Sequence, residues 1–149
     1  MRTNNNRDLP VELSYYGLTL LSYLKESHPH LAADTGFIET RADEASEAYS
    51  EAIKDGLSHP EAEELANFTL FRDLLFSRYD TIINVLWNEF PDIIPQSRAK
   101  EYALRIQQEC ESVFAAYPIS DEFMYSEEYN KLYTELTGFI FLWLEENEL

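Results

Sequence analysis

Hydrophobic residues recur along this chain at the three- and four-residue spacing of amphipathic helices, not in the alternating order of strands. Valine, which favours strands, occurs three times against nineteen leucines. The whole chain contains four glycines and six prolines, so few positions interrupt a helix. The pattern predicts an all-α fold, a single-domain bundle of about five helices around a long central helix.

Two amphipathic helices are predicted in the first third of the chain. The first spans about residues 10–27 and ends at His28-Pro29-His30. The second starts after Asp34, which is suited to cap its N-terminus, and ends at Gly56, which is suited to a helix C-terminus. The apolar stripe of this second helix consists of Ile38, Ala42, Ala45, Tyr49, Ala52 and Ile53.

The third helix is predicted to be the longest and to form the centre of the bundle. Ser58 and Glu61 have the spacing of a capping box, in which each side chain bonds the backbone N–H of the other residue. No glycine or proline follows between Pro60 and Pro91, so the helix is predicted to continue to about Phe90. A helix of that length spans about 45 Å.

Two further helices complete the prediction. One spans about residues 97–116 and ends before Pro118, and the other follows Ser126 and ends at about Glu146. The apolar stripe of the last helix consists of Tyr129, Leu132, Tyr133, Leu136, Ile140 and Trp143. The whole chain, 1–149, is predicted to be one domain, with residues 1–9 as a flexible N-terminus.

The charge of the chain limits its partners. Twenty-eight acidic residues face eleven basic ones, a formal net charge of -17 that repels phosphate backbones, and no lysine or arginine cluster counters it. We therefore expect a basic protein partner and no direct nucleic-acid binding. The longest apolar run, residues 139–144, is far shorter than the roughly 20 residues of a membrane span, so no membrane association is expected.

Further features of the chain predict a cytoplasmic protein that needs no cofactor. The single thiol, Cys110, cannot form an internal disulfide, and the first eight residues lack the pattern of a signal peptide. Cys110 lies on an apolar stripe without a basic neighbour on that face, which predicts a core thiol and not a nucleophile.

Two surfaces are candidates for interaction. Glu44, Glu47 and Glu51 lie opposite the apolar stripe of the second helix, where they either contact a basic partner or simply keep the protein soluble. Tyr133 and Trp143 belong to an aromatic run on the last helix. Since Phe141 and Leu142 extend its apolar surface, this C-terminal helix is a candidate for homo-oligomer formation.

Arg72 breaks the apolar pattern of the predicted central helix. A helical projection places it between Phe68 and Phe76, in the middle of the buried face. A buried guanidinium requires a carboxylate or a set of carbonyls, so Arg72 is predicted to form a buried ion pair, with Glu135 as the candidate partner.

Catalytic and metal-binding patterns are weak in this chain. Glu44-x-x-Glu47 and Glu61-x-x-Glu64 have the spacing of the magnesium ligands in helical pyrophosphatases of the MazG type. The helical pattern points these glutamates away from the core, which favours solvated charge over a catalytic site. His28 and His30 near Asp34 could hold a transition metal, but a solvated turn is the preferred interpretation.

Three parts of the chain carry a family resemblance. They are residues 12–18, Ser77-Arg78-Tyr79 together with Asn88-Glu89-Phe90, and residues 132–138. These segments resemble a family of small acidic proteins of unknown function from Bacteroidetes, often encoded near conjugative transposons and other mobile elements. The resemblance implies an all-helical fold and a mobile-element context, and it brings no catalytic residue with it.

The leading hypothesis is a non-catalytic acidic interaction or accessory protein that binds a basic protein. A first alternative is a DNA mimic that inhibits a DNA-binding or restriction protein. A second alternative is a magnesium-dependent helical nucleotide pyrophosphatase, for which convergent buried carboxylates would be required.

Overall fold

The computed structural model describes residues 13–149, and these residues contain helices and no β-strand. The all-α prediction is confirmed. The described chain forms two compact units, one ending at Arg72 and the other running from Asp73 to Leu149, here called unit 1 and unit 2. The predicted flexible segment 1–9 and the first residues of the first predicted helix lie outside the described residues.

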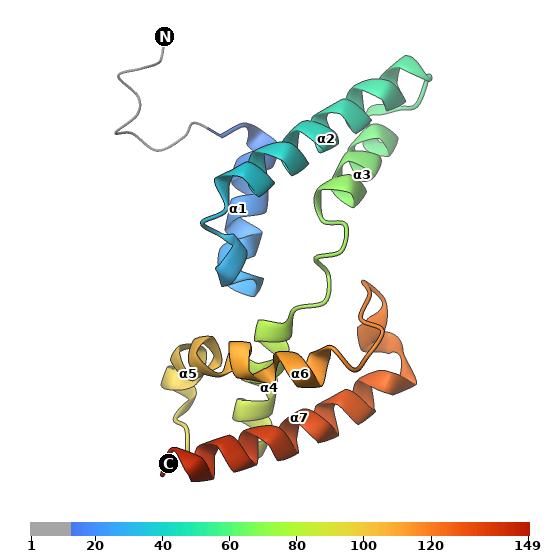
Figure 1. Cartoon of the computed structure of the whole chain (residues 1–149). Coiled ribbons are helices and arrows are strands. Elements are labelled where there is room, and N and C mark those ends of the chain that lie inside the picture. Colours follow the sequence, from blue (N-terminus) through green and yellow to red (C-terminus); the bar gives the residue numbers. More distant parts are fainter. Residues whose placement is uncertain (1–12) are drawn as a thin grey trace, which may run out of the picture. The chain divides into compact units, whose positions relative to one another are not determined.

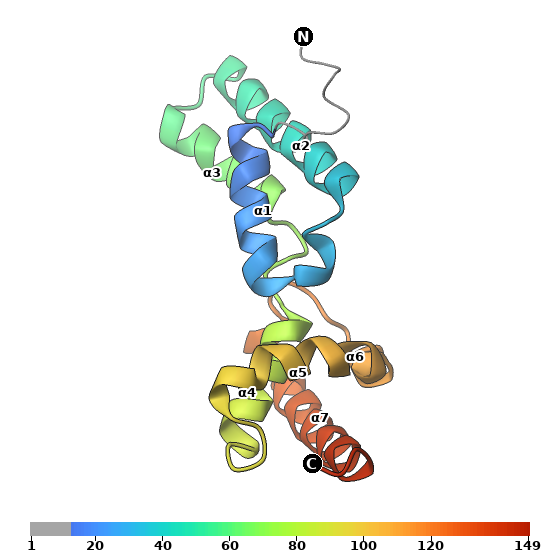
Figure 2. The same ribbon diagram turned by 90° about the vertical axis from the view of Figure 1, so that its left-hand side faces the viewer.

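Unit 1 consists of α1 (Tyr15–Ser27), α2 (Thr35–Lys54) and α3 (His59–Leu70), with a short 3-10 turn at Pro29–Leu31. Helices α2 and α3 lie side by side, as Figure 1 and its rotated view in Figure 2 show. Small residues on both helices allow this close approach. The buried residues of the pair are Ile38, Ala42, Ala45, Ala52, Ala62, Ala66 and Leu70.

The helix ends of unit 1 follow the predicted signals. Asp34 accepts a hydrogen bond from the backbone N–H of Phe37 at 3.0 Å, and Gly56 has a left-handed φ of 91°. The capping box forms as well: Ser58 N–H donates to Glu61 Oε1 at 2.9 Å, and Glu61 N–H donates to Ser58 Oγ at 3.3 Å. Local sequence therefore determined where α2 and α3 begin.

Unit 2 consists of α4 (Arg78–Glu89), α5 (Ala99–Ile106), α6 (Glu111–Phe114) and α7 (Glu127–Glu146), with 3-10 turns at Gln96–Arg98, Gln107–Cys110 and Phe123–Tyr125. Helix α4 contacts both α5 and α7. Its buried residues are Tyr79, Thr81, Ile82, Ile83, Val85 and Leu86. Helix α4 is therefore the centre of this unit.

The predicted fourth and fifth helices are found in unit 2, with two differences. The 3-10 turn at Gln107–Cys110 separates α5 from α6 within the predicted helix 97–116. Ser126 precedes α7 as predicted, but its hydroxyl donates to the carbonyl of Phe123 at 2.7 Å and does not cap the helix. In the described part of the chain, no helix combines the length and the apolar character needed to cross a membrane.

The predicted continuous helix from about residue 58 to 90 is wrong. Helix α3 ends at Leu70, and α4 begins only at Arg78. Asp73 adopts a left-handed φ of 67°, which no α-helix accommodates. Ser77 then starts a new helix, because its Oγ accepts the backbone N–H of Asp80 at 2.9 Å.

Two side chains from elsewhere in the sequence satisfy the backbone groups freed by this break. Arg41 Nη1 donates to the carbonyls of Leu70 at 3.1 Å and of Arg72 at 2.7 Å. The carboxylate of Asp121 accepts the N–H groups of Asp73 at 2.9 Å and of Leu75 at 3.0 Å. Since free backbone groups at a helix end need partners, these contacts take the place of the missing helical hydrogen bonds.

Replacement of Asp121 by alanine should destabilise unit 2 by about 1 to 3 kcal/mol, because two backbone donors lose a charged acceptor. Urea unfolding followed by circular dichroism measures the change. The exposed neighbour Glu122 is the control, and Glu122→Ala should change the unfolding midpoint little. Equal effects of the two substitutions would show that Asp121 does not stabilise the segment between α3 and α4.

Cys110 lies in the core of unit 2, where burial raises the pKa of its thiol to about 12. We expect the native protein to react with a thiol-specific disulfide reagent at pH 8 at least about a hundredfold more slowly than the urea-unfolded chain, because the thiolate is the reactive form. Absorbance of the released reagent anion measures the rate. Similar rates in both states would contradict the buried position.

Candidate interaction surfaces

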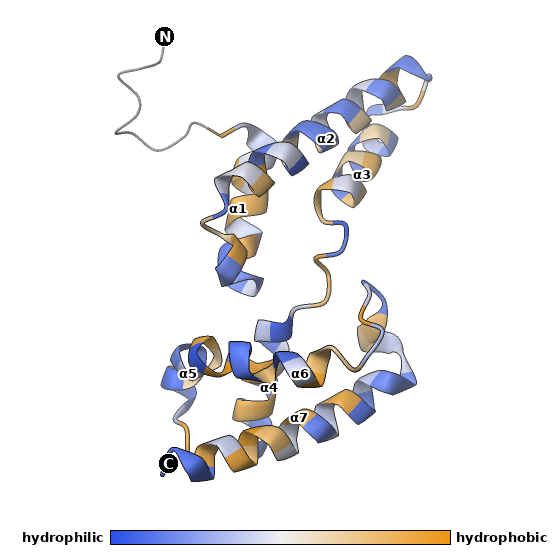
Figure 3. Cartoon of the chain, in the orientation of Figure 1, coloured by the Kyte–Doolittle hydropathy of each residue, from blue (hydrophilic) through white to orange (hydrophobic). Residues whose placement is uncertain are grey.

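Five carboxylates occur at every fourth residue along α2 and its C-terminal cap. This acidic ridge consists of Glu39, Asp43, Glu47, Glu51 and Asp55, all of them exposed. Each step advances about 6 Å along the helix axis, so the ridge is about 24 Å long. Figure 3 shows hydrophilic segments along much of α2, while the opposite face of the helix is buried in unit 1.

The ridge is electrostatically uncompensated over most of its length. Only Glu51 has a basic neighbour, with its Oε2 3.9 Å from Lys54 Nζ, and no salt bridge within residues 13–149 includes Glu39, Asp43 or Glu47. Like charges four residues apart on a helix destabilise it by roughly 0.2–0.5 kcal/mol per pair. The four successive pairs therefore oppose the helix that carries them.

Glu44 does not belong to this ridge, although the sequence grouped it with Glu47 and Glu51. Its Oε1 lies 3.7 Å from Arg41 Nε and 3.5 Å from Arg72 Nη2. Glu44 thus lies between Arg41 of α2 and Arg72, which follows the end of α3. The charge available to a partner lies one helix face away, on the ridge.

The predicted burial of Arg72 is wrong, and its pairing with Glu135 of unit 2 stays a prediction. The Arg72 side chain is 44% exposed and lies next to Glu44. Glu135, in unit 2, accepts a hydrogen bond from the hydroxyl of Tyr117 at 2.6 Å. The helical projection failed because it assumed a continuous helix, whereas Arg72 lies in the turn that follows α3.

Arg41 has the environment that the sequence assigned to Arg72. Its side chain is only 11% exposed, donates to the carbonyls of Leu70 and Arg72, and lies 5.0 Å over the ring of Phe37. The available signal was the spacing of Phe37, Arg41 and Glu44, which places an aromatic ring and a carboxylate on either side of the arginine.

Two hydrogen-bonded pairs of titratable side chains link the helices of unit 1, and the sequence did not predict them. The Tyr16 hydroxyl donates to Glu63 Oε1 at 2.7 Å, and the Tyr49 hydroxyl forms a hydrogen bond with Nδ1 of His59. Burial raises the pKa of Tyr16, and the hydrogen bond to Glu63 adds to the shift. These contacts hold α3 against α1 and α2.

Tyr133 connects two of the segments that carry the family resemblance. Its hydroxyl donates to Glu89 Oε2 at 3.0 Å and accepts from Asn88 Nδ2 at 3.3 Å. Burial is the main cause of the raised pKa of Tyr133. Next to this cluster is a pocket of about 300 Å³, lined by Trp87, Asn88, Pro91, Ile94 and Gln96.

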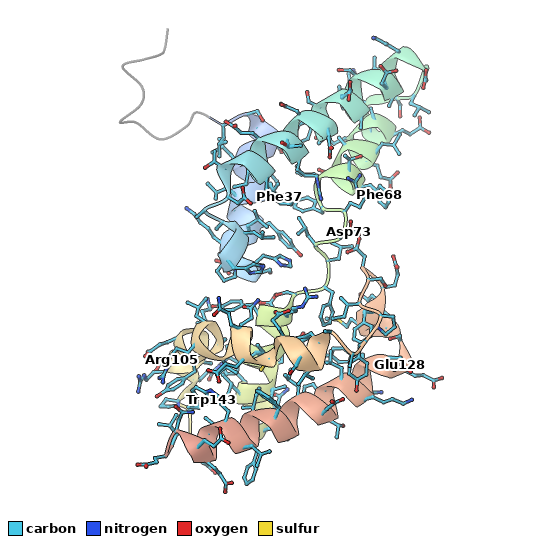
Figure 4. The ribbon with its side chains drawn as sticks, viewed as in Figure 1. Phe37, Phe68, Asp73, Arg105, Glu128 and Trp143 are labelled. Carbon is cyan, nitrogen blue, oxygen red and sulfur yellow. The ribbon has the colours of Figure 1, made fainter. Side chains whose placement is uncertain are left out.

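Trp143 does not form an exposed surface with Tyr133. It is 5% exposed and lies in the core of unit 2. The guanidinium of Arg105 lies 5.4 Å from its ring centroid (Figure 4). Tyr133 is half-buried against the same core. Phe141 and Leu142, at 47% and 58% exposure, form the exposed apolar part of α7.

The candidate catalytic and metal-binding residues mostly have structural contacts. Glu61 is engaged in the capping box, where the backbone N–H of Ser58 lowers the pKa of its carboxyl. His28 is buried, so the interpretation as a solvated turn was wrong for this residue. Within residues 13–149, no three His, Cys, Asp or Glu side chains are grouped as metal ligands.

Comparisons with known proteins give a family and a fold but no activity. The family described as a domain of unknown function (DUF1896) matches residues 8–149. The crystal structure of protein PG0816 from Porphyromonas gingivalis is similar over 93% of this chain and 94% of that one, with 44% sequence identity and a TM-score of 0.87. No curated protein matches the chain.

Arg41→Ala should destabilise unit 1 by about 2 to 3 kcal/mol, because charged hydrogen bonds to the carbonyls at the end of α3 are lost. Arg72→Ala serves as the matched substitution and should cost less than about 1 kcal/mol, since its ion pair is exposed. Urea unfolding of both variants measures the difference. A larger loss of stability for Arg72→Ala than for Arg41→Ala would show that Arg72, and not Arg41, stabilises the end of α3.

Proposed function

The chain belongs to the family of the domain of unknown function DUF1896, and we propose that it is a non-catalytic interaction protein that binds a basic protein through the acidic ridge of α2. The observation that supports this proposal is the ridge itself: five exposed carboxylates at regular spacing, most of them without a basic neighbour among the described residues. Such a row destabilises its own helix, so a partner that neutralises it gains the energy of the relieved repulsion.

The physical role of the ridge is to attract and orient the partner. A net charge of -17 draws a basic surface from a distance, and the local row then favours lysine or arginine side chains spaced about 6 Å apart, as on one face of a helix. At a Debye length of about 8 Å in physiological salt, this attraction acts mainly on the association rate.

The proposal places the protein in the cytoplasm as an accessory factor, with the mobile-element context implied by its family resemblance. A DNA mimic that inhibits a DNA-binding or restriction protein is the second candidate function. It is supported by the even spacing of charges along one helix, which resembles the regular charge of a nucleic-acid strand. Competition with duplex DNA distinguishes the two candidates.

We do not extend the proposal to the magnesium-dependent pyrophosphatase. Of the glutamates that suggested it, Glu44 pairs with Arg41 and Arg72, and Glu61 is held by Ser58. Two of the four candidate ligands therefore have structural roles.

The triple variant Glu39→Gln, Asp43→Asn and Glu47→Gln should bind the partner about tenfold more weakly than the parent, because it removes the uncompensated part of the ridge. Folding should remain intact or gain roughly 0.5–1.5 kcal/mol, since three repulsive pairs disappear. Affinity capture from native lysate at low and high salt, with quantitative mass spectrometry, measures partner retention, and urea unfolding measures stability.

The matched control is the triple variant Glu122→Gln, Glu127→Gln and Glu146→Gln, which changes the net charge equally at exposed positions of unit 2. It should retain the partner. If both triple variants lose it equally, net charge and not the ridge determines binding. If duplex DNA displaces the partner, the DNA-mimic function is supported, and if it does not, the accessory role is supported.

A further inference from the structure

Helix α7 has one face in the core of unit 2 and an opposite face in contact with solvent. Leu132, Leu136 and Ile140 are fully buried, while Thr134, Glu135 and Gly138 between them are exposed. Figure 4 labels Glu128 in the first turn of the helix and Trp143 in its last turn. The outer face of α7 is defined here by the exposed residues Lys131, Thr134, Gly138, Phe141, Leu142 and Glu145.

Gly138 lies at the centre of this outer face and has no explanation within the chain. It lies mid-helix, it does not have a positive φ, and a Cβ added to it would meet nothing within 4 Å. Glycine weakens the interior of a helix relative to alanine. Its recognised use at such a position is to let another backbone come close.

We propose that the outer face of α7 binds the same face of a second copy of this chain, as an antiparallel helix pair whose twofold axis passes near Gly138. The two backbones approach most closely where the side chains are absent. On each side of Gly138, Phe141 and Leu142 of one copy lie against Thr134 and Glu135 of the other.

Charge supports the antiparallel orientation and the choice of a second copy. Lys131 and Glu145 are each seven residues from Gly138, so the symmetry places Lys131 of one copy against Glu145 of the other, twice in the dimer. A parallel pair would instead place Lys131 against Lys131 and Glu145 against Glu145. Antiparallel helices also align their macrodipoles favourably.

The size of the face predicts a weak dimer. A 20-residue helix is about 30 Å long and about 10 Å wide, so each copy buries about 300 Å², below the roughly 800 Å² per partner of a standard stable interface. The -17 charge of each copy adds repulsion that salt screens. Dimerisation should therefore strengthen as salt rises, opposite to partner capture by the acidic ridge, so failure of either proposal leaves the other testable.

The first test is a cysteine cross-link in the full chain. Gly138→Cys should form a disulfide-linked dimer under oxidised glutathione, because the twofold axis brings the two introduced thiols together. Native Cys110 is buried and does not compete. Glu127→Cys, at another exposed position of α7 eleven residues away, is the control and should cross-link at least tenfold more slowly. Equal rates for the two variants would overturn the twofold axis at Gly138.

The second test is sedimentation equilibrium at low and high salt, up to millimolar concentration. Lys131→Glu and Glu145→Lys should each weaken the dimer about tenfold, and the double variant should restore it to within about threefold, since the swap recreates opposite charges. Phe141→Glu should abolish it, whereas Leu104→Glu, an exposed apolar position on α5, should not. A monomer under all conditions, or a double variant that fails to recover, overturns the proposal.

Discussion

The structure depends on how the free backbone groups between α3 and α4 find partners. Arg41 donates to the last carbonyls of unit 1, and Asp121 accepts the first N–H groups of unit 2. A break in a helix is stable only when such groups are satisfied, because each buried, unpaired donor or acceptor costs free energy. With these contacts, one predicted long helix becomes two helices that pack into different cores.

Some acidic side chains of this protein stabilise the fold, whereas others are exposed without a partner among the described residues. Glu44 is paired with Arg41 and Arg72, and the carboxylate of Asp121 accepts hydrogen bonds from backbone N–H groups. The acidic ridge has no comparable compensation over most of its length. Because repulsion within the ridge lowers helix stability while compensated carboxylates raise it, net charge alone does not reveal which acidic residues are available for binding.

Unit 2 shows a similar division among aromatic residues. Trp143 and Tyr133 belong to the same stripe as the core residues of α7, and their rings pack inward. Trp143 makes a cation–π contact with Arg105, and Tyr133 donates a hydrogen bond to Glu89. The residues left exposed on α7 include two apolar side chains and a glycine at which an added Cβ would meet nothing within 4 Å. An amphipathic stripe predicts which face of a helix is buried, and the exceptions to the stripe then identify the surface that a partner can use.

The sequence by itself determined the helical class, the capping of α2 and α3, and the buried position of Cys110. It also determined the stripe of α7 and that of α2 except for Ile53, which is exposed. These features depend on local periodicity and on hydrogen bonds within a few residues. The sequence also contained the Ser77 capping signal that restarts the chain as α4. Only the tertiary structure decided that α3 ends at Leu70, that Arg41 and not Arg72 is the shielded arginine, and that Glu44 is neutralised while Glu47 is free of such pairing. Those outcomes rest on contacts between residues about 28 to 48 positions apart, which no periodicity along the chain encodes.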